Sequence, residues 1–179
     1  MKFVIPARKR ICKKTIFKLL GPHTNPCNAK RQILGVYDKG LLKTFGNVSN
    51  LLKMHHVLVV HGNDGLDEIS ITDKTFVTEL KDGNLNQFEI QPEDFGLSRA
   101  NITALKAETP EESLELINAA FEGKESPVQD MISLNAGASL YLSSASNSIK
   151  EGVSLAKELL NNGKAKQTFS SYIEMTNSL

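Results

Sequence analysis

The stretch His61-Gly62-Asn63-Asp64-Gly65-Leu66-Asp67-Glu68-Ile69-Ser70 decides how the rest of this chain is interpreted. It follows the apolar, largely β-branched run 57–60, which is typical of a buried strand in a parallel sheet. Two glycines and small polar residues allow the backbone a tight turn where that strand ends. In open α/β sheets, ligands bind in the crevice at the carboxyl ends of the strands. The sequence therefore predicts a ligand site directly after this strand.

This stretch contains three carboxylates, Asp64, Asp67 and Glu68, within five consecutive residues. They repel one another unless water or a cation neutralises them. Mg²⁺ prefers hard oxygen ligands, and it commonly takes one or two carboxylates while water and substrate phosphates fill its other positions. Two interpretations stay open on this ground: a site for a metal and a phosphate, or an ordinary solvated acidic loop.

The composition is that of one globular domain. The chain has 179 residues, of which 40% are hydrophobic and 23% charged, enough for a sizeable core. No apolar run approaches the roughly 20 residues of a transmembrane helix, and residues 1–6 are too few for a signal peptide. The two cysteines, Cys12 and Cys27, match no zinc spacing. We expect free thiols in a reducing compartment, and therefore a cytoplasmic protein with no membrane partner.

Basic residues concentrate at the start of the chain, and no acidic residue precedes Asp38. Three interpretations stay open: a nucleic-acid contact, a pocket wall for phosphates or a carboxylate, or a solvated helix face. No aromatic residues alternate with the charges to stack bases, so we expect no nucleic-acid partner. The basic residues are Lys2, Arg8, Lys9, Arg10, Lys13, Lys14, Lys18, Lys30 and Arg31.

The hydrophobic pattern predicts an α/β fold with a mostly parallel sheet flanked by helices. Residues 32–37 and 57–60 are predicted as strands, and the helical spacing of apolar residues in 41–52 predicts the helix between them. The crossover of this unit should be right-handed. His55 and His56 have no metal-ligand partner at a suitable spacing and are interpreted as a loop. For His23, alone in a turn, we expect no chemical role.

A hairpin and four helices are predicted after the quoted stretch. Asp82-Gly83 between the strand-like runs 75–80 and 85–90 is a strong hairpin signal. Gly123 and Gly163 predict the ends of two helices, and a last helix follows from about Lys164. Small residues in 137–145 allow another helix to pack closely on the middle one. Capping boxes predict helix starts at Thr109, Ser126 and Ser148.

The quoted stretch resembles the signature His-Gly-x-Asp-Gly-Leu-Asp-Glu-x-Ser of the anthranilate phosphoribosyltransferase family. Several matches in the same order are more specific than one short motif. The family's chain is about twice as long, and this sequence resembles its C-terminal half. The other similar segments are Thr15-Ile16-Phe17, Leu19-Leu20-Gly21-Pro22, Asn25-Pro26, 32–37, Pro92-Glu93-Asp94-Phe95-Gly96-Leu97 and Leu134-Asn135-Ala136.

The resemblance implies the C-terminal portion of a nucleoside-phosphorylase-like, phosphoribosyltransferase α/β domain. Residues 1–22 then belong to the edge and hinge of a helical domain, and residues 23–179 form part of the α/β domain. The family's glycine-rich phosphate loop, Gly-Thr-Gly-Gly-Asp, has no counterpart, since the chain's 12 glycines include no Gly-x-Gly pair. The chain thus resembles half of an active site, and we expect it to be inactive alone.

The family reaction, a step of tryptophan biosynthesis, transfers a phosphoribosyl group from phosphoribosyl pyrophosphate to anthranilate with Mg²⁺ on the leaving pyrophosphate. By resemblance, Asp67 and Glu68 hold the metal, and Gly62 and Asp64 shape the turn beside them. Arg8 matches the arginine that contacts anthranilate, whose carboxylate a guanidinium grips through two parallel hydrogen bonds. Arg8 is equally explained as one basic residue among many.

Other functions and partners stay open as well. The chain is alternatively a non-catalytic remnant or binding module, or a nucleoside-phosphorylase-like enzyme that needs no such metal, although the paired Asp67 and Glu68 argue against the last. Asn135 matches a family position, yet an inward-facing helix residue bonded to the backbone explains it equally. A separate N-terminal half is one possible partner. Self-association through exposed apolar side chains is another, and the side chains expected to be exposed are Phe3, Val4, Ile16, Phe17 and Leu20.

Overall fold

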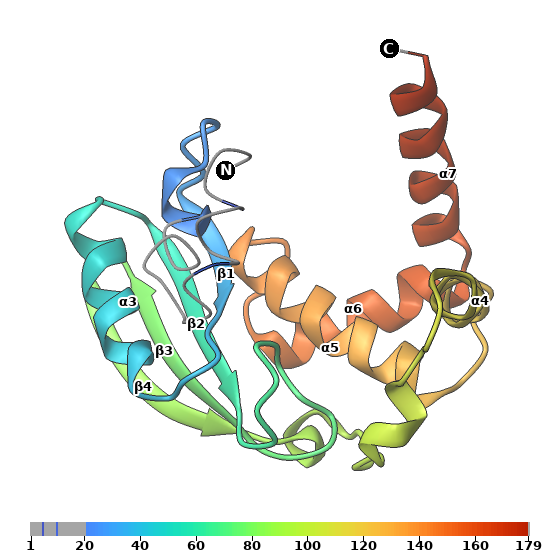
Figure 1. Ribbon diagram of the computed structural model, residues 1–179, viewed down its shortest axis with the longest axis horizontal. Helices are drawn as coiled ribbons and strands as arrows, with labels where there is room; N and C mark the ends of the chain where they lie inside the picture. The colour runs from blue at the N-terminus through green and yellow to red at the C-terminus, as the bar shows by residue number, and fades with distance from the viewer. Residues whose placement is uncertain (1–4, 6–9, 11–20, 179) are drawn as a thin grey trace.

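The computed structural model describes Ile5, Arg10 and residues 21–178 (Figure 1). Its centre is a four-stranded sheet in the order β1-β2-β3-β4. The strands are β1 (Arg31–Gly35), β2 (His56–Gly62), β3 (Thr75–Lys81) and β4 (Asn84–Ile90). The helices are α3 (Leu41–Leu51), α4 (Pro110–Phe121), α5 (Pro127–Leu142), α6 (Ile149–Asn161) and α7 (Lys164–Asn177). The short 3-10 helices are η2 (Gly21–Thr24), η3 (Pro92–Phe95) and η4 (Ile102–Leu105).

The sheet is mixed, and the expectation of a mostly parallel sheet is wrong for the described strands. β1 and β2 pair in parallel across α3, whereas β2 with β3 and β3 with β4 pair antiparallel. A parallel partner needs a crossover back to the start of the strand, usually a helix. Residues 63–74 contain no helix and fold at the end of β2, so β3 re-enters the sheet from that same end. The α/β class, the flanking helices and the β3–β4 hairpin are confirmed.

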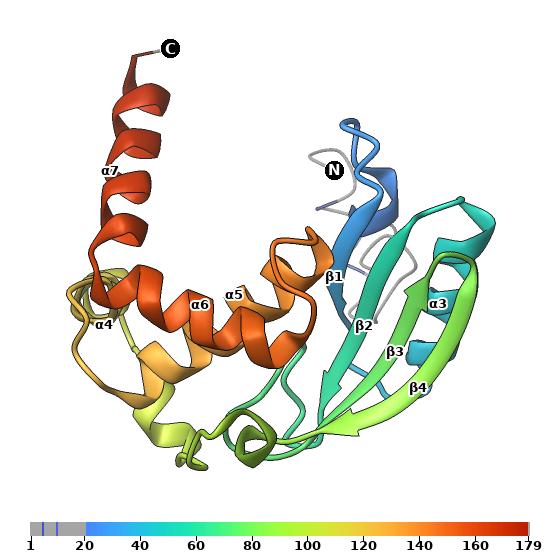
Figure 2. The same ribbon diagram turned by 180° about the vertical axis from the view of Figure 1, so that it is seen from behind.

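β2 is buried on both faces because helices cover the sheet from both sides (Figures 1 and 2). Successive side chains of a strand point to opposite faces. Val57 and Val59 accordingly pack in the cluster beneath α3, and Leu58 and Val60 pack in the cluster that includes Leu134 of α5. The central position of β2 explains its nearly continuous apolar run.

His56 begins β2 with 3% of its surface exposed, so the prediction of a loop at this residue is wrong. Its Nε2 lies 2.7 Å from Glu79 Oε1 on β3, and the Tyr141 hydroxyl donates to the same oxygen at 2.9 Å. A buried polar side chain is tolerated when it is hydrogen-bonded. The partners of His56 come from β3 and α5, and these are distant in the sequence.

The predicted helix starts and ends are confirmed. The hydroxyl oxygens of Thr109, Ser126 and Ser148 each accept a backbone N–H three residues later at 3.1 Å. Gly123 and Gly163 adopt φ values of +76° and +77°, which favour glycine after a helix. These local signals account for where α4, α5 and α6 begin and where α4 and α6 end.

Helices α5 and α6 pack backbone to backbone through two glycines. A Cβ on Gly137 would overlap the main chain of Val153, and a Cβ on Gly152 would overlap the carbonyl of Gly137. The prediction of a close helix contact in this part of α5 is confirmed, with α6 as the neighbour.

Helix α7 projects away from the rest of the molecule in both views (Figures 1 and 2). None of its residues is buried, and Phe169 stacks on Phe121 with ring centroids 5.2 Å apart. Tyr172, Ile173 and Met175 are exposed. Across residues 21–178, no helix combines the length and the apolar character needed to span a membrane.

Candidate functional site

Residues 61–70 form a compact loop, the acidic loop, at the carboxyl end of β2. The Gly62 amide donates to the Leu66 carbonyl at 2.8 Å, and the Gly65 amide donates to the Gly62 carbonyl at 2.9 Å. Gly65 adopts a φ of +93°, a conformation that side chains disfavour. The turn brings the residues after Leu66 back toward the sheet.

Asp64 makes its hydrogen bonds inside the loop. Its carboxylate accepts from the hydroxyls of Ser70 and Thr72, and from the Leu66 amide at 3.1 Å. Partial burial alone would raise the pKa of Asp64, but these hydrogen bonds outweigh burial and hold the pKa below its usual value. A Cβ on Gly62 would overlap the Asp64 carboxylate. Asp64 therefore ties the two ends of the loop together.

Asp67 and Glu68 lie where the carboxyl ends of β1 and β2 meet. A Cβ on Gly35, the last residue of β1, would overlap the Asp67 carbonyl, so the two backbones are in direct contact. Both acidic residues are exposed. Among the described residues, neither carboxylate forms a hydrogen bond or an ion pair.

The pKa of the Glu68 carboxyl is raised, first by its partial burial and then by the negative charge of Asp67. Glu68 also lines two cavities. One of about 440 Å³ lies between the loop, η4, α4 and α5, and the other, of about 480 Å³, runs between β1 and α5. A cation beside Glu68 would favour its ionised form.

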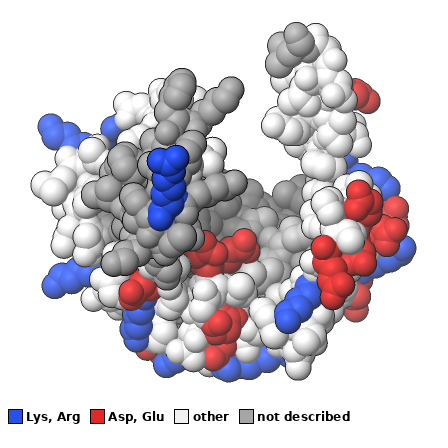
Figure 3. All heavy atoms as spheres, viewed as in Figure 1, with Lys and Arg blue, Asp and Glu red and all other residues white. Residues whose placement is uncertain are grey.

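The described residues offer a pair of carboxylates rather than a closed metal cage. Within residues 21–178, Ile5 and Arg10, no group of three or more His, Cys, Asp or Glu side chains is suited to hold a metal ion. The acidic side chains that gather over α4 in Figure 3 belong to a solvated helix face. Asp67 and Glu68 fit the donor set of Mg²⁺ where substrate phosphates and water complete the coordination.

Of the two other residues that the resemblance singled out, Asn135 is described by the structure and Arg8 is not. Asn135 on α5 accepts a hydrogen bond from the Ile69 amide at 3.0 Å and donates to the Ile69 carbonyl at 2.9 Å and the Met131 carbonyl at 3.1 Å. Its amide is thus bonded to backbone, and part of that backbone belongs to the loop. Arg8 lies outside the described residues.

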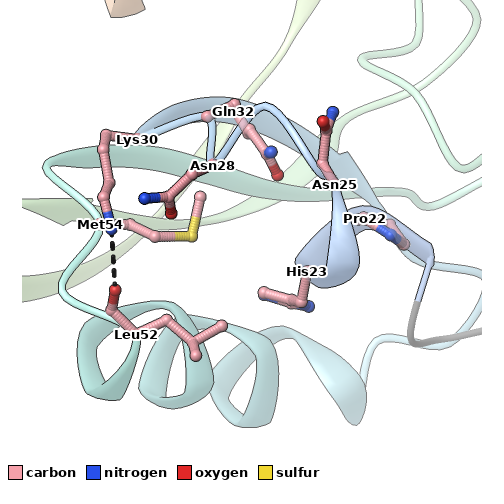
Figure 4. A pocket seen from close by; sticks show the side chains of 9 residues that line it. Pro22, His23, Asn25, Asn28, Lys30, Gln32, Leu52 and Met54 are labelled. Carbon is pink, nitrogen blue, oxygen red and sulfur yellow. Dashed lines mark hydrogen bonds between the residues drawn. The ribbon is translucent and has the colours of Figure 1, made fainter.

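A small polar cavity of about 70 Å³ lies beside the turn that precedes β1 (Figure 4). His23 in its wall lies 3.1 Å from the Ser49 hydroxyl and packs on Phe45, and burial lowers the pKa of this histidine. The buried Oε1 of Gln32 has no hydrogen-bond partner among the described residues. A cavity of this size suits ordered water, and His23 joins the turn to α3.

Sequence reasoning did not identify Gly35 as part of this site. A glycine at the end of a short strand signals close backbone approach in general, but its partner is 32 positions further along the chain. His61 has a structural role. Its Nδ1 lies 2.8 Å from the Val36 carbonyl, and this contact links β2 to the residue that follows β1.

The chain is similar to known proteins over nearly its whole length. It is 44% identical to the anthranilate phosphoribosyltransferase of Methanobrevibacter smithii over 178 residues, which cover 99% of this chain and 53% of that protein. The crystal structure of the Thermus thermophilus enzyme superposes with a TM-score of 0.89 and 36% identity over 97% of this chain and 51% of that one.

A yeast relative has been solved with ligands. The Saccharomyces cerevisiae anthranilate phosphoribosyltransferase in complex with PRPP and Mg superposes with a TM-score of 0.89 and 29% identity over 100% of this chain and 52% of that one. The same protein has been solved with 4-fluoroanthranilate. The chain spans about half the length of the relatives it matches.

The family itself is shown by a sequence model described as "Glycosyl transferase family, a/b domain", which matches residues 1–166. This match covers most of the chain, and the mixed sheet with its acidic loop is the corresponding α/β architecture. The chain belongs to this glycosyl transferase family.

Proposed function

We propose that this chain contributes the metal-binding half of an anthranilate phosphoribosyltransferase active site. The observation that carries the proposal is the Asp67–Glu68 pair, exposed and unpaired among the described residues where β1 and β2 end. The ligands named for the yeast relative, PRPP, Mg and 4-fluoroanthranilate, support the same substrates and metal for this chain.

In this reaction the bond between ribose and pyrophosphate breaks, a bond to the anthranilate amine forms, and the amine loses a proton. When bound, Mg²⁺ neutralises charge on the leaving pyrophosphate. Asp67 and Glu68 bind the metal, while Gly62 and Asp64 shape the turn that presents them. Arg8, outside the described residues, is proposed to bind the anthranilate carboxylate.

The chain alone is proposed to be inactive. None of its 12 glycines forms a Gly-x-Gly pair, so these residues supply no glycine-rich loop to cradle a pyrophosphate. Positioning accounts for about 7–11 kcal/mol of catalysis in favourable cases. Without a group that positions the pyrophosphate, these 179 residues should therefore show no detectable turnover.

A partner that carries the other half of the site is proposed to bind beside β1. This strand is the outer strand of the described sheet on that side, and edge strands accept further strands. The cavity of about 480 Å³ between β1 and α5 offers apolar surface next to that edge. Self-association through exposed apolar surface is the alternative to such a partner. The cytoplasmic location remains a prediction.

Metal binding tests the central assignment. We expect calorimetry or Mn²⁺ relaxation to detect weak binding, because only two protein carboxylates contribute. The double variant Asp67→Asn with Glu68→Gln should lose this binding. Glu111→Gln with Glu115→Gln removes the same charge from the exposed face of α4 and should retain it. Equal binding by both double variants would remove the metal assignment.

A further inference from the structure

The amide of Asn135 satisfies both main-chain groups of one loop residue. Its Oδ1 accepts from the Ile69 N–H at 3.0 Å, and its Nδ2 donates to the Ile69 carbonyl at 2.9 Å. The two residues are 66 positions apart, on α5 and in the acidic loop. A side-chain amide that both accepts from and donates to one residue pairs with it as a neighbouring strand would.

Ile69 is itself an anchor for the loop. It is 1% exposed and belongs to the core cluster with Leu58 and Leu134. The next residue, Ser70, donates its backbone N–H to the Thr75 hydroxyl at 2.9 Å. The chain immediately after Glu68 is therefore fixed to the core by side-chain packing and by hydrogen bonds.

The other end of the acidic pair is fixed by Gly35. The Asp67 carbonyl lies where a side chain at this position would begin, so the loop backbone rests directly on the end of β1. Asp67 and Glu68 thus lie between two fixed points, one on β1 and one on α5. Their side chains extend from a backbone that is held in place before any ligand binds.

We infer that Asn135 is a positioning residue for the metal site, with Gly35 as its counterpart on β1. This inference rests on the proposed function, since it assigns Asn135 to the orientation of Asp67 and Glu68 toward a divalent cation. A preorganised pair of ligands loses less conformational entropy on binding than a mobile one. Outer partners of metal ligands typically contribute about 10–100-fold to metal affinity.

The test compares Asn135→Ala with Ser133→Ala, a control on the same helix. Ser133 is fully buried and donates to the Gln129 carbonyl at 2.7 Å, and among the described residues its hydroxyl forms no hydrogen bond to the loop. We expect Asn135→Ala to weaken Mn²⁺ binding about tenfold and to speed hydrogen exchange at the Ile69 amide. Ser133→Ala should lower the melting temperature but leave the Mn²⁺ affinity and the Ile69 exchange unchanged.

Gly35→Ala changes the contact on the β1 side of the acidic pair, and it provides a second test if Asn135→Ala does not fold. Its methyl group would displace the Asp67 backbone, so it should weaken Mn²⁺ binding by a similar factor. Gly21→Ala is its control, because a Cβ there meets no atom within 4 Å. An additional variant, Asn135→Asp, keeps the size of the side chain but loses the donation to the Ile69 carbonyl.

Each outcome decides the inference. Equal loss of Mn²⁺ affinity in Asn135→Ala and Ser133→Ala would mean that Asn135 affects the metal site only through the overall stability of the fold. Unchanged Ile69 exchange in Asn135→Ala would contradict the contact itself, whereas Asn135→Asp keeps an oxygen that accepts from the Ile69 N–H and should retain the slow exchange. If the unmodified protein binds no Mn²⁺, the proposed function and the metal role of Asn135 both fail, whereas the exchange experiment still reports on the contact.

Discussion

Glu68 is a carboxylate whose ionisation the fold disfavours. Its side chain is partly buried and lies next to the negative charge of Asp67, and both effects raise its pKa. For an acid with a raised pKa in the folded state, stability falls as the pH rises from the unfolded pKa through the folded pKa. The ionised residue is thus kept at a cost to stability, which is typical of residues that bind a ligand.

Glu68→Gln should therefore stabilise the metal-free protein at pH 7 and have no such effect below about pH 4, where the unmodified residue is protonated. The gain should be of the order of a few tenths of a kcal/mol, because water screens much of the side chain. Urea denaturation between pH 4 and pH 8 measures it, with Glu115→Gln as the exposed control. A loss of stability at pH 7 would contradict this account of Glu68.

At the scale of elements, the contact between α5 and α6 depends on glycine at two positions. The absence of a side chain lets the helix backbones meet, so Gly137 packs on the main chain of Val153, and Gly152 packs on the carbonyl of Gly137. Because α5 also carries Asn135, the position of this helix bears on the acidic loop.

Gly137→Ala should destabilise the fold by about 1–3 kcal/mol, the usual cost of overpacking a close contact. Alanine is the better helix former by up to about 1 kcal/mol, which offsets part of this cost. Thermal and urea denaturation measure the effect. Gly21→Ala, where a Cβ meets no atom within 4 Å, should be nearly neutral. Equal stability of the two variants would mean that α5 and α6 separate easily.

At the scale of the whole molecule, three features bear on association with other chains: the sheet edge at β1, the acidic loop and the projecting helix α7. β1 lies at the edge of the described sheet, and α7 exposes Tyr172, Ile173 and Met175. Exposed apolar side chains and open strand edges favour association with other chains. The side chains predicted to be exposed among residues 1–20 lie outside the described residues, so that prediction stays open.

Mixing tests the role of a partner. The chain alone should form no detectable phosphoribosylanthranilate, and addition of a separately expressed N-terminal half of a family member should restore turnover if the halves associate. Glu68→Gln should abolish the restored activity, whereas Glu115→Gln should not. Activity of the chain alone that depends on Glu68 would show that these residues suffice. Firm association without turnover would favour a binding module.

The local features of this fold could be predicted from the sequence because their partners are close in the chain. The hydroxyls of Thr109, Ser126 and Ser148 bond to amides three residues later, and Asp82-Gly83 closes a hairpin between adjacent strands. The acidic loop was found in the same way, since its glycines and carboxylates are contiguous. Residues 61–70 by themselves therefore determined where the candidate site begins.

The tertiary structure alone decided which distant groups meet there. No local pattern predicts that β3 returns antiparallel, that His56 pairs with Glu79, or that the Asp67 backbone rests on Gly35. Asn135 was ambiguous in the sequence, because a buried amide on a helix always needs a partner and the pattern does not say which one. Packing of α5 against the sheet brings it to Ile69, and this long-range contact holds the acidic pair in place.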